Sequence, residues 1–403
     1  MDTLDAPQGR FVLTRYPVRR NEQLRAWDAA DDYVLRFLAD QQRPRQAAGS
    51  TVIVNDGWGA LAVALATHQP VSLSDSFMSH RATRENLMTN SVVATDVTCV
   101  ASRGHLSTPI ATLVVKVPRS LALLEDQLCH VAPHVTADTL VVAGAMTKNV
   151  HTSTIELFER ILGPTRTSLA EKKARLIICT PNPDRIAAVS PWPCSFTLDG
   201  GQQVISHAGV FSAERLDPGT RFLLEKLRVG VGPQQVVDLG CGNGILGLLS
   251  AIQNPESEVT FVDESYLALA SAEATFRANL GPARAARFMV GNGLFDAADG
   301  DGLAFDTVDR VLCNPPFHVD NALGDATAWQ MFSESRQALR IDGELWVVGN
   351  RHLAYHAKLK RIFGHCEVVA GNAKFVVLRA VRRETRRGQG PADLHDDDDV
   401  HDG

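Results

Sequence analysis

The chain has 403 residues, of which 45% are hydrophobic and 21% are charged, a composition typical of a globular protein with two or three domains. Its formal net charge of −6 comes from the six aspartates of DLHDDDDVHDG (393–403), because the rest of the chain carries equal numbers of acidic and basic residues. Composition therefore excludes a uniformly basic nucleic-acid-binding protein, although a neutral body can bind RNA through basic residues clustered on one face.

Several other classes are excluded by what the sequence lacks. It has no apolar run of about 18 residues, so no membrane span is expected. The first residues, MDTLDAPQGR, are acidic and lack the apolar core of a secretory signal. The seven cysteines are scattered without a C-x-x-C pair, which favours reduced thiols over disulfides or a zinc site. We expect a cytoplasmic protein without a metal; a monomer is compatible with the sequence, which does not define the oligomeric state.

The first half of the chain alternates apolar strands with helical stretches. STVIVNDGWGALAVALA (50–66) predicts a strand, a glycine-containing turn and the start of an apolar helix. Further apolar strands are predicted in QPVSLSDS (69–76), ATLVVKVPR (111–119), DTLVVAGA (138–145) and ARLIICT (174–180). Strands that alternate with helices predict parallel βαβ units in a doubly wound sheet.

The next segment, PNPDRIAAVSPWPCSFTLDGG (181–201), is rich in proline and glycine and has no hydrophobic periodicity. We interpret residues 181–206 as a linker between two domains, which cover residues 1–180 and 207–381.

The second half repeats the cues of the first half in the same order. QQVVDLGCGNGILGLLSA (234–251) has the layout of the first strand, turn and helix, and EVTFVDES (258–265) is again an apolar strand that ends in an acid. The strands of DRVLCNPPF (309–317), GELWVVGN (343–350) and KFVVLRA (374–380) follow. Five similarities in register indicate duplication. The predicted fold class is therefore α/β, with two tandem Rossmann-like doubly wound sheets.

The two copies differ where chemistry is expected. Aligning the loops places Asn55 opposite Asp238 and Leu61 opposite Gly244, and it places K-V-P-R opposite N-P-P-F. The first copy has thus lost a loop glycine, an amide and an aromatic ring. We expect that it no longer catalyses and instead holds the substrate or the second domain.

The loop after the first strand of the second copy, D-L-G-C-G-N-G, predicts a nucleotide site at a helix N-terminus. Its G-x-G-x-x-G spacing matches the dinucleotide fingerprint, but that match alone is weak. The carboxylate of Asp238 would repel a pyrophosphate, whereas it would attract the sulfonium and ammonium of S-adenosylmethionine. The pattern therefore favours S-adenosylmethionine as the cofactor, held by Asp238 and by Gly240, Gly242, Asn243 and Gly244.

Polar residues also follow the next two strands of the second copy. Asp263 has the spacing expected of a carboxylate that accepts hydrogen bonds from ribose hydroxyls. Glu264 beside it is interpreted as a solvated charge at a helix start. Asn292 is a candidate for hydrogen bonding to the adenine amine, and an ordinary turn asparagine is an equally good interpretation.

VLCNPPFHV (311–319) is a strand that stops at an asparagine and two prolines. The side-chain oxygen of Asn314 and the carbonyl of Pro315 can both accept hydrogen bonds from an amine, and proline holds them in place before the substrate binds. Phe317 offers a face on which a flat base can stack. These features predict methylation of an amino group on a planar substrate and leave guanine, adenine and a glutamine side chain open. We assign no role to His318.

Basic residues near strand ends are candidate phosphate contacts, although a solvated charge is the simpler interpretation of each. Lys116 and Arg119 replace the amide and the ring in the first copy, and Arg351 and Lys374 lie near strand ends of the second. The tail from residue 382 to 403 is expected to be disordered and solvated. Its arginines, which could also touch phosphate, are Arg382, Arg383, Arg386 and Arg387.

On these residues the chain resembles bacterial ribosomal RNA guanine-N2 methyltransferases, in particular the large-subunit methyltransferase G family. The resemblance covers about residues 10 to 381 and rests on these stretches: LTRYP, LRAWDAADDYVL, NDGWGAL, KVPRSLALLEDQL, HTSTIELFERILGPT, VDLGCGNG, LCNPPFH, NRHLAYHAKLKRIFG and KFVVLRA. The amino-terminal stretches match the large-subunit enzymes better than their small-subunit relatives. The tail is the main departure from the family.

The resemblance implies a degenerate amino-terminal methyltransferase-like domain that recognises RNA and an active carboxy-terminal class I methyltransferase domain. It implies transfer of methyl from S-adenosylmethionine to N2 of a single guanine in large-subunit ribosomal RNA, the expected partner. By motif, Asn314, Pro315 and Phe317 fall at the target base. The stretch HAGVFSAERLDPGT (207–220) is expected to fold over the cofactor, with Phe211 as the candidate contact.

Four alternatives remain open at this point. Two are methylation of guanine N2 in small-subunit ribosomal RNA and methylation of another amine, such as adenine N6 or a protein glutamine. The third is a nicotinamide-dependent oxidoreductase, against which Asp238 argues. The fourth is a non-catalytic RNA-binding or ribosome-assembly protein, against which the intact second copy argues.

Overall fold

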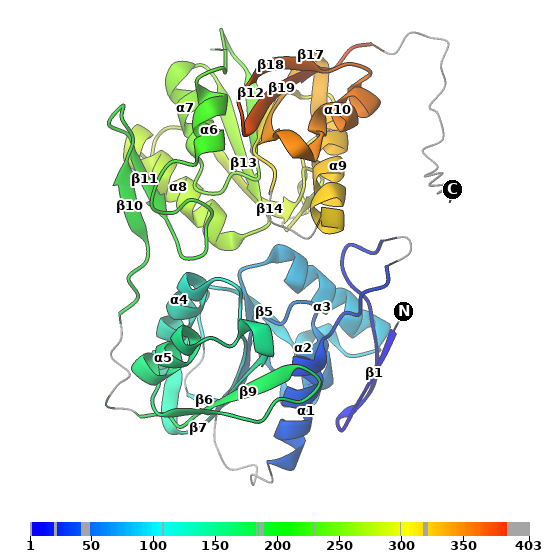
Figure 1. The fold of residues 1–403 in the computed structure, drawn as a ribbon, viewed down its shortest axis with the longest axis vertical. Helices are drawn as coiled ribbons and strands as arrows, with labels where there is room; N and C mark the ends of the chain where they lie inside the picture. The colour runs from blue at the N-terminus through cyan, green and yellow to red at the C-terminus, as the bar shows by residue number, and fades with distance from the viewer. Residues whose placement is uncertain are drawn as a thin grey trace.

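The computed structural model describes residues 2–384, apart from 20–21, 42–48, 107–108, 183, 185–188, 229, 299 and 317–320. This part of the chain forms two lobes, each built around a twisted sheet, with the amino-terminal half below the carboxy-terminal half in Figure 1. Among the described residues, no helix combines the length and the apolar character needed to cross a bilayer.

The sheet of the first half has the doubly wound order predicted from the sequence. Its strands are β3 (Ser50–Val54), β4 (Val71–Ser74), β5 (Thr98–Ala101), β6 (Ile110–Lys116), β7 (Val135–Met146), β8 (Thr165–Thr167) and β9 (Ala174–Cys179). Across the sheet they lie in the order β5-β4-β3-β6-β7-β9-β8. The first five in this order are parallel, and β9 runs antiparallel to both β7 and β8.

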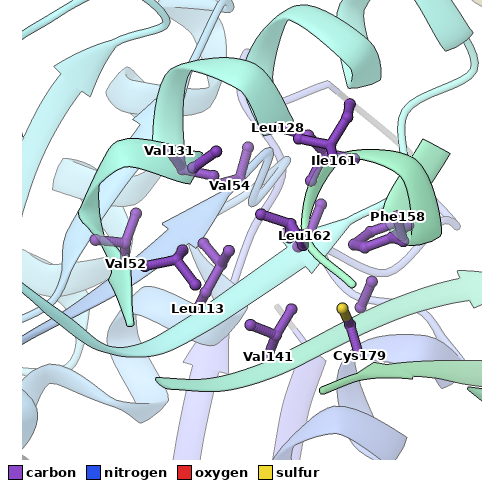
Figure 2. Packing of buried hydrophobic residues seen from close by; sticks show 14 of the residues in the cluster. Val52, Val54, Leu113, Leu128, Val131, Val141, Phe158, Ile161, Leu162 and Cys179 are labelled. Carbon is purple, nitrogen blue, oxygen red and sulfur yellow. The ribbon is translucent and has the colours of Figure 1, made fainter. Parts of the chain in front are cut away.

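Helices cover both faces of this sheet because its strands are apolar on both sides. They are α1 (Ala29–Asp40), α2 (Ala60–Ala64), α3 (Phe77–Thr89), α4 (Leu121–Val131) and α5 (Thr152–Ile161). Helices α4 and α5 bury Leu128 and Phe158 against Val52 and Leu113 of the sheet (Figure 2). Helices α1, α2 and α3 pack on the opposite face.

The sheet of the second half repeats this order and adds one short edge strand. Its strands are β12 (Gln235–Leu239), β13 (Glu258–Asp263), β14 (Arg287–Asn292), β15 (Asp296–Ala297), β16 (Val308–Cys313), β17 (Leu339–Asn350), β18 (Glu367–Gly371) and β19 (Phe375–Val381). Their order is β15-β14-β13-β12-β16-β17-β19-β18. The helices that cover it are α6 (Pro218–Leu224), α7 (Ile245–Gln253), α8 (Tyr266–Leu280), α9 (Asn321–Ala338) and α10 (Tyr355–Phe363). The predicted fold of two tandem doubly wound sheets is confirmed.

Strand register relates the two halves residue by residue and corrects one predicted alignment. Gly59 and Gly244 each precede the helix after the first strand and have left-handed φ angles of 80° and 78°. Asn55 then matches Gly240, and their φ angles of 63° and 69° agree. The expected pairings of Asn55 with Asp238 and of Leu61 with Gly244 are therefore wrong by two residues. Asparagine tolerates the left-handed conformation, so the loop shape survived the loss of a glycine.

The predicted linker contains ordered structure that belongs to the second half. A hairpin of β10 (Cys194–Thr197) and β11 (Gln203–Ser206) forms its second part, and the backbone nitrogen of Gln203 donates to Asn279 Oδ1 of α8 at 3.0 Å. The first half begins with an equivalent hairpin, β1 (Asp2–Ala6) and β2 (Gly9–Leu13), in which the backbone nitrogen of Val12 donates to Oδ1 of Asn90, the C-cap of α3, at 2.8 Å. The duplicated unit thus starts with a hairpin, so residues 194–206 are its first element rather than a structureless connection.

Candidate active site

A cavity of about 660 Å³ opens where the strands β12, β13 and β16 end. The carboxyl ends of parallel strands, at the point where strand order reverses, are where doubly wound sheets bind their ligands. The walls come from the loop after β12, the ends of β13 and β14, the turn after β16, the segment 209–220 and helix α9. Two lining residues, Asp75 and Met78, come from the first half of the chain.

The loop after β12 brings backbone close to the cavity through glycines at positions that side chains avoid. Gly240 and Gly242 line the cavity with φ angles of 69° and 53°. A Cβ at Gly242 would meet no atom within 4 Å, so the loop leaves open space there. At Gly244 a Cβ would lie 2.8 Å from that of Ala272, so this glycine allows α7 and α8 to approach closely rather than lining the cavity. Asn243 lines the cavity, and its amide donates to Ser206 Oγ at 3.2 Å.

Asp238 lies beneath this loop and does not line the cavity. Only 1% of it is exposed, and its Oδ2 accepts a hydrogen bond from the backbone nitrogen of Gly247 at 2.8 Å. Burial, helped by the nearby charge of Asp263, raises the pKa of Asp238 to about 8. Its visible role is to tie the strand to the first turn of α7. A direct contact between Asp238 and a cofactor remains a prediction.

Asp263 lies at the end of β13 with its carboxylate at the cavity wall. Its Oδ2 accepts from the backbone nitrogen of Gly242 at 3.0 Å, and its Oδ1 accepts from that of Ser265 at 3.0 Å. Burial raises the pKa of Asp263. The carboxylate therefore joins the glycine loop to the start of α8, and it lies where the sequence places an acceptor for ribose hydroxyls.

The donor set of this cavity fits S-adenosylmethionine. It combines an open glycine-rich backbone, a helix N-terminus and partly buried carboxylates whose ionised form a cationic ligand would stabilise. Phe211, which is 50% exposed, and Asn292 lie on two other parts of the wall. The amide of Gln330 lies 3.4 Å from the Asn292 side-chain oxygen. Binding of adenine by Asn292 and of the cofactor by Phe211 stay predictions.

Asn314 follows β16 and presents its amide to the same cavity. Its Nδ2 donates to Thr220 Oγ1 at 2.9 Å and to Asp217 Oδ2 at 3.2 Å, both at the start of α6. Its Oδ1 is buried and has no hydrogen-bond partner among the described residues. Pro315 and Pro316 line the cavity beside it. Phe317 and His318 lie outside the described residues, so the predicted stacking contact stays a prediction.

The first half reaches the cavity through a contact in which matching loops of the two halves pair with each other. Ser76 and Ser265 form an antiparallel bridge, in which the backbone nitrogen of Phe77 donates to the Glu264 carbonyl and that of Tyr266 donates to the Asp75 carbonyl. Their side chains repeat this exchange. Ser76 Oγ donates to Glu264 Oε2 at 2.7 Å, and Ser265 Oγ donates to Asp75 Oδ2 at 2.6 Å.

The interpretation of Glu264 as a solvated helix-start charge is therefore wrong. Contact with the first half leaves Glu264 only partly exposed, and this loss of solvent raises its pKa to about 7. Burial raises the pKa of Asp75 to about 7 as well. Sequence reasoning missed both the burial of Glu264 and the position of Asp75 at the cavity. The sequence does contain a hint, because D-S-F after β4 matches E-S-Y after β13. This similarity does not, however, show that the two loops contact each other.

The two predicted phosphate contacts in the first half, Lys116 and Arg119, have different surroundings. Lys116 occupies the position of Asn314, but its ammonium pairs with Asp28 at 2.8 Å and Asp31 at 2.7 Å, and only 14% of the side chain is exposed. The idea that Lys116 offers a free charge to RNA is therefore wrong, because α1 uses that charge to offset two carboxylates. Arg119 is exposed and stays a candidate.

In the second half, the guanidinium of Arg351 donates to the Asn372 carbonyl at 3.0 Å, and Lys374 lies over the ring of Phe375. Arg382 is engaged with Asp306 and the Leu339 carbonyl. Residues 385–403 of the tail lie outside the described residues. Phosphate binding by Arg351 and Lys374 stays a prediction.

Comparisons with known proteins agree with this architecture. Residues 1–183 match the family described as the RLMG N-terminal domain, and residues 201–379 match the methyltransferase small domain. A Streptomyces avermitilis protein named ribosomal RNA large subunit methyltransferase G is 53% identical over 95% of this chain and 100% of its own length. An Aeromonas salmonicida protein of the same name is 48% identical over 94% of this chain and 99% of its own.

A solved structure shares the whole architecture at low sequence identity. It is the T. thermophilus 16S rRNA N2 G1207 methyltransferase in complex with AdoMet and guanosine, with a TM-score of 0.72 and 22% identity. The match covers 95% of this chain and 98% of that one, so both lobes and their arrangement are shared. At this identity the likeness shows the class I methyltransferase fold alone.

Proposed function

This chain belongs to the ribosomal RNA large subunit methyltransferase G family, and on that premise we propose that it methylates the exocyclic N2 amine of one guanine in 23S ribosomal RNA with S-adenosylmethionine. The names of the relatives support a methyltransferase that acts on large-subunit ribosomal RNA. The site supports an exocyclic amine as the methyl acceptor, and guanine N2 is proposed among such amines because the Asn-Pro-Pro-Phe turn resembles that of ribosomal RNA guanine-N2 methyltransferases.

The observation that carries the choice of an amine is the acceptor of Asn314, which has no partner among the described residues. A buried amide oxygen that no described residue bonds, in the same cavity as the glycine loop, suits a ligand that brings an N–H group. An exocyclic base amine has two N–H groups, and the carbonyl of Pro315 is a second acceptor available for them.

In this mechanism the residues of the chain hold and orient the amine. The electron pair of an exocyclic amine is conjugated with the ring and is weakly nucleophilic. Hydrogen bonds to Asn314 Oδ1 and to the Pro315 carbonyl direct that pair out of the base plane, and the two prolines keep these acceptors in place. S-adenosylmethionine, when bound by the loop of Gly240 and Gly242 and by Asp263, supplies an electrophilic methyl group. The methylated amine is acidic and releases its proton to water, so no strong general base is required.

The first half is proposed to recognise ribosomal RNA, because it keeps the fold without the side chains of the site. Arg119 is the exposed cation of its former catalytic rim. The target guanine has to leave its stack to enter the cavity, which costs least where it is already unpaired. Ribosomal RNA matures in the bacterial cytoplasm, and we place the protein there.

Incubation of the purified protein with radiolabelled S-adenosylmethionine and total ribosomal RNA from cells that lack this gene tests the proposal. We expect label in the 23S fraction, as N2-methylguanosine after digestion to nucleosides, and no label with Asn314→Ala. Primer-extension mapping then identifies the position.

Each other outcome rejects a specific part of the proposal. Label in 16S RNA would reject the large subunit, N6-methyladenosine would reject guanine, and label in ribosomal protein would reject RNA as the substrate. Thermal protection of the protein by NAD but not by S-adenosylmethionine would reject the cofactor.

A further inference from the structure

We propose that Asp217 and Thr220, at the start of α6, are positioning residues that fix the rotation of the Asn314 amide, so that its oxygen and not its nitrogen faces the substrate amine. This inference rests on the proposed function, because it concerns how the methylated amine is recognised. Neither residue was singled out by the sequence motifs.

The argument begins with the ambiguity of an amide. Rotation of the Asn314 side chain by half a turn exchanges an acceptor and a donor of nearly the same size, so packing alone does not choose between them. If Nδ2 faced the cavity, it would meet the N–H groups of the substrate as a second donor. Catalysis therefore needs an element that selects one rotation.

Asp217 and Thr220 supply that selection. A carboxylate only accepts hydrogen bonds, so Asp217 Oδ2, 3.2 Å from the Asn314 amide, requires the nitrogen on its side. Thr220 Oγ1 accepts the second N–H at 2.9 Å. Both amide protons are then bound, and the oxygen points away, where the described residues leave it buried without a partner. The reverse rotation would place Oδ1 against the carboxylate.

The two partners are themselves held rigidly. Asp217 is the N-cap of α6, where its Oδ2 also accepts the backbone nitrogen of Thr220 at 2.7 Å, and Pro218 fixes the first helical turn. Gly219 lets this turn approach the sheet, since a Cβ there would lie 3.2 Å from the ring of Phe375. Leu223 is fully buried beneath the helix. Asp217 and Thr220 therefore move only if α6 moves on the sheet.

The first half repeats the geometry with different chemistry. Helix α1 also begins at a capping aspartate, Asp28, and the residue within its reach at the end of β6 is Lys116 instead of an amide. The position of Thr220 is taken there by Asp31, which forms the second ion pair with Lys116. In both halves, the N-terminus of one helix, α1 or α6, fixes the side chain at the carboxyl end of one strand, β6 or β16. Only in the second half do the partners leave an acceptor free.

Thr220→Val, which keeps the size of the side chain and removes its oxygen, tests the inference, with Thr220→Ser as the matched variant. Loss of one hydrogen bond is expected to lower kcat for RNA methylation about five- to tenfold, while Thr220→Ser restores most of the rate. Asp217→Asn is expected to lower kcat as well, because an amide at that position no longer forbids the wrong rotation. Affinity for S-adenosylmethionine and melting temperature are measured for every variant.

Asp28→Asn in α1 is the control for a general effect of helix capping, and its kcat is expected to match the wild type. The positioning role is overturned if Thr220→Val and Asp217→Asn keep the wild-type kcat, or if Thr220→Ser loses as much activity as Thr220→Val. If the wild-type protein labels an amine other than guanine N2, the proposed function is overturned. The comparison of Thr220→Val with Thr220→Ser would still decide whether Asp217 and Thr220 position Asn314 toward that amine.

Discussion

The two halves of this chain show how a site can be dismantled while its scaffold stays intact. Both sheets have the same strand order, and β7 and β17 bury the same positions along their lengths. Even the hairpin contact is repeated, through Asn90 in one half and Asn279 in the other. Apolar periodicity and a few structural polar groups are thus enough to retain the fold.

Differences that bear on the site lie at or near the ends of three strands. Register places Ile53 where the second half has Asp238, and Ser74 where it has Asp263. Lys116 takes the place of Asn314. The lesson is that stability and chemistry occupy separate positions in this fold, so each can be changed without the other.

One loop has a different fate from the rest of the site. At the end of β4 a serine, Ser74, stands where the second half has Asp263, yet the next residues, Asp75 and Ser76, bond to Ser265 and Glu264 of the other half, and Asp75 lines its cavity. The degenerate half is therefore a structural part of the intact site.

The largest expected effect comes from substituting the same structural position in each half, Asn314 in the second and Lys116 in the first. Asn314→Ala is expected to lower kcat on the order of 100-fold or more, because it removes an acceptor for the reacting amine, with little change in affinity for the methyl donor. Radiolabel transfer and calorimetric titration measure the two quantities. Lys116→Ala, at the matching position, should lower the melting temperature by leaving Asp31 buried without its cation and keep kcat. Equal kcat losses would contradict the separation of roles.

A second test concerns the last residues of β13 and β4, Asp263 and Ser74. Asp263→Ala is expected to weaken binding of S-adenosylmethionine roughly 10- to 100-fold, since hydrogen bonds to a charged group are lost together with the tie to Gly242. Ser74→Ala, its counterpart, should leave the affinity unchanged in the same calorimetric titration. An unchanged affinity in Asp263→Ala would show that the carboxylate does not contact the donor.

The loop glycines predict a smaller and symmetric effect on stability. Gly59→Ala and Gly244→Ala should each cost on the order of 2 kcal/mol, because both glycines have left-handed φ angles and an added Cβ would lie less than 3 Å from Thr83 of α3 or Ala272 of α8. Urea unfolding measures the change. Gly57→Ala, where a Cβ meets no atom within 4 Å, is the control. A loss in only one half would mean that the loops are not equivalent.

The weakest expected effect is the pH dependence of stability that comes from Asp75 and Glu264, at the contact between the halves. The pKa of Asp75 and that of Glu264 are each raised to about 7 by burial, so the folded protein binds more protons than the unfolded chain. Stability should therefore fall as the pH rises from about 4 to about 7, by on the order of 1 kcal/mol or more for each group. Thermal unfolding in a pH series, with Asp75→Asn and Glu264→Gln, should show a flatter profile in the variants. A profile as steep as in the wild type would show that these acids are not the groups responsible.

Much of the site could be predicted because its parts are local. The glycine loop, Asp263 and the Asn-Pro-Pro turn each follow a strand, and parallel strands bring their carboxyl ends together at one edge of the sheet. The alignment of Asn55 with Asp238 failed for a local reason too. The alignment paired two polar residues, whereas the backbone conformation pairs Asn55 with Gly240. An asparagine in the left-handed region does not look like a glycine in the sequence.

The sequence by itself determined the duplication, the doubly wound sheets and the edge of the sheet at which the cavity opens, because these depend on periodicity and on conformational limits of glycine and proline. Only the tertiary structure decided which residues line the cavity, a set that excludes Asp238 and Gly244, and which residues support them. Asp217 and Thr220 reach Asn314 across more than 90 positions of the chain, and Ser76 reaches Glu264 across 188. Such pairs have no spacing rule, since packing of whole helices and domains brings them together.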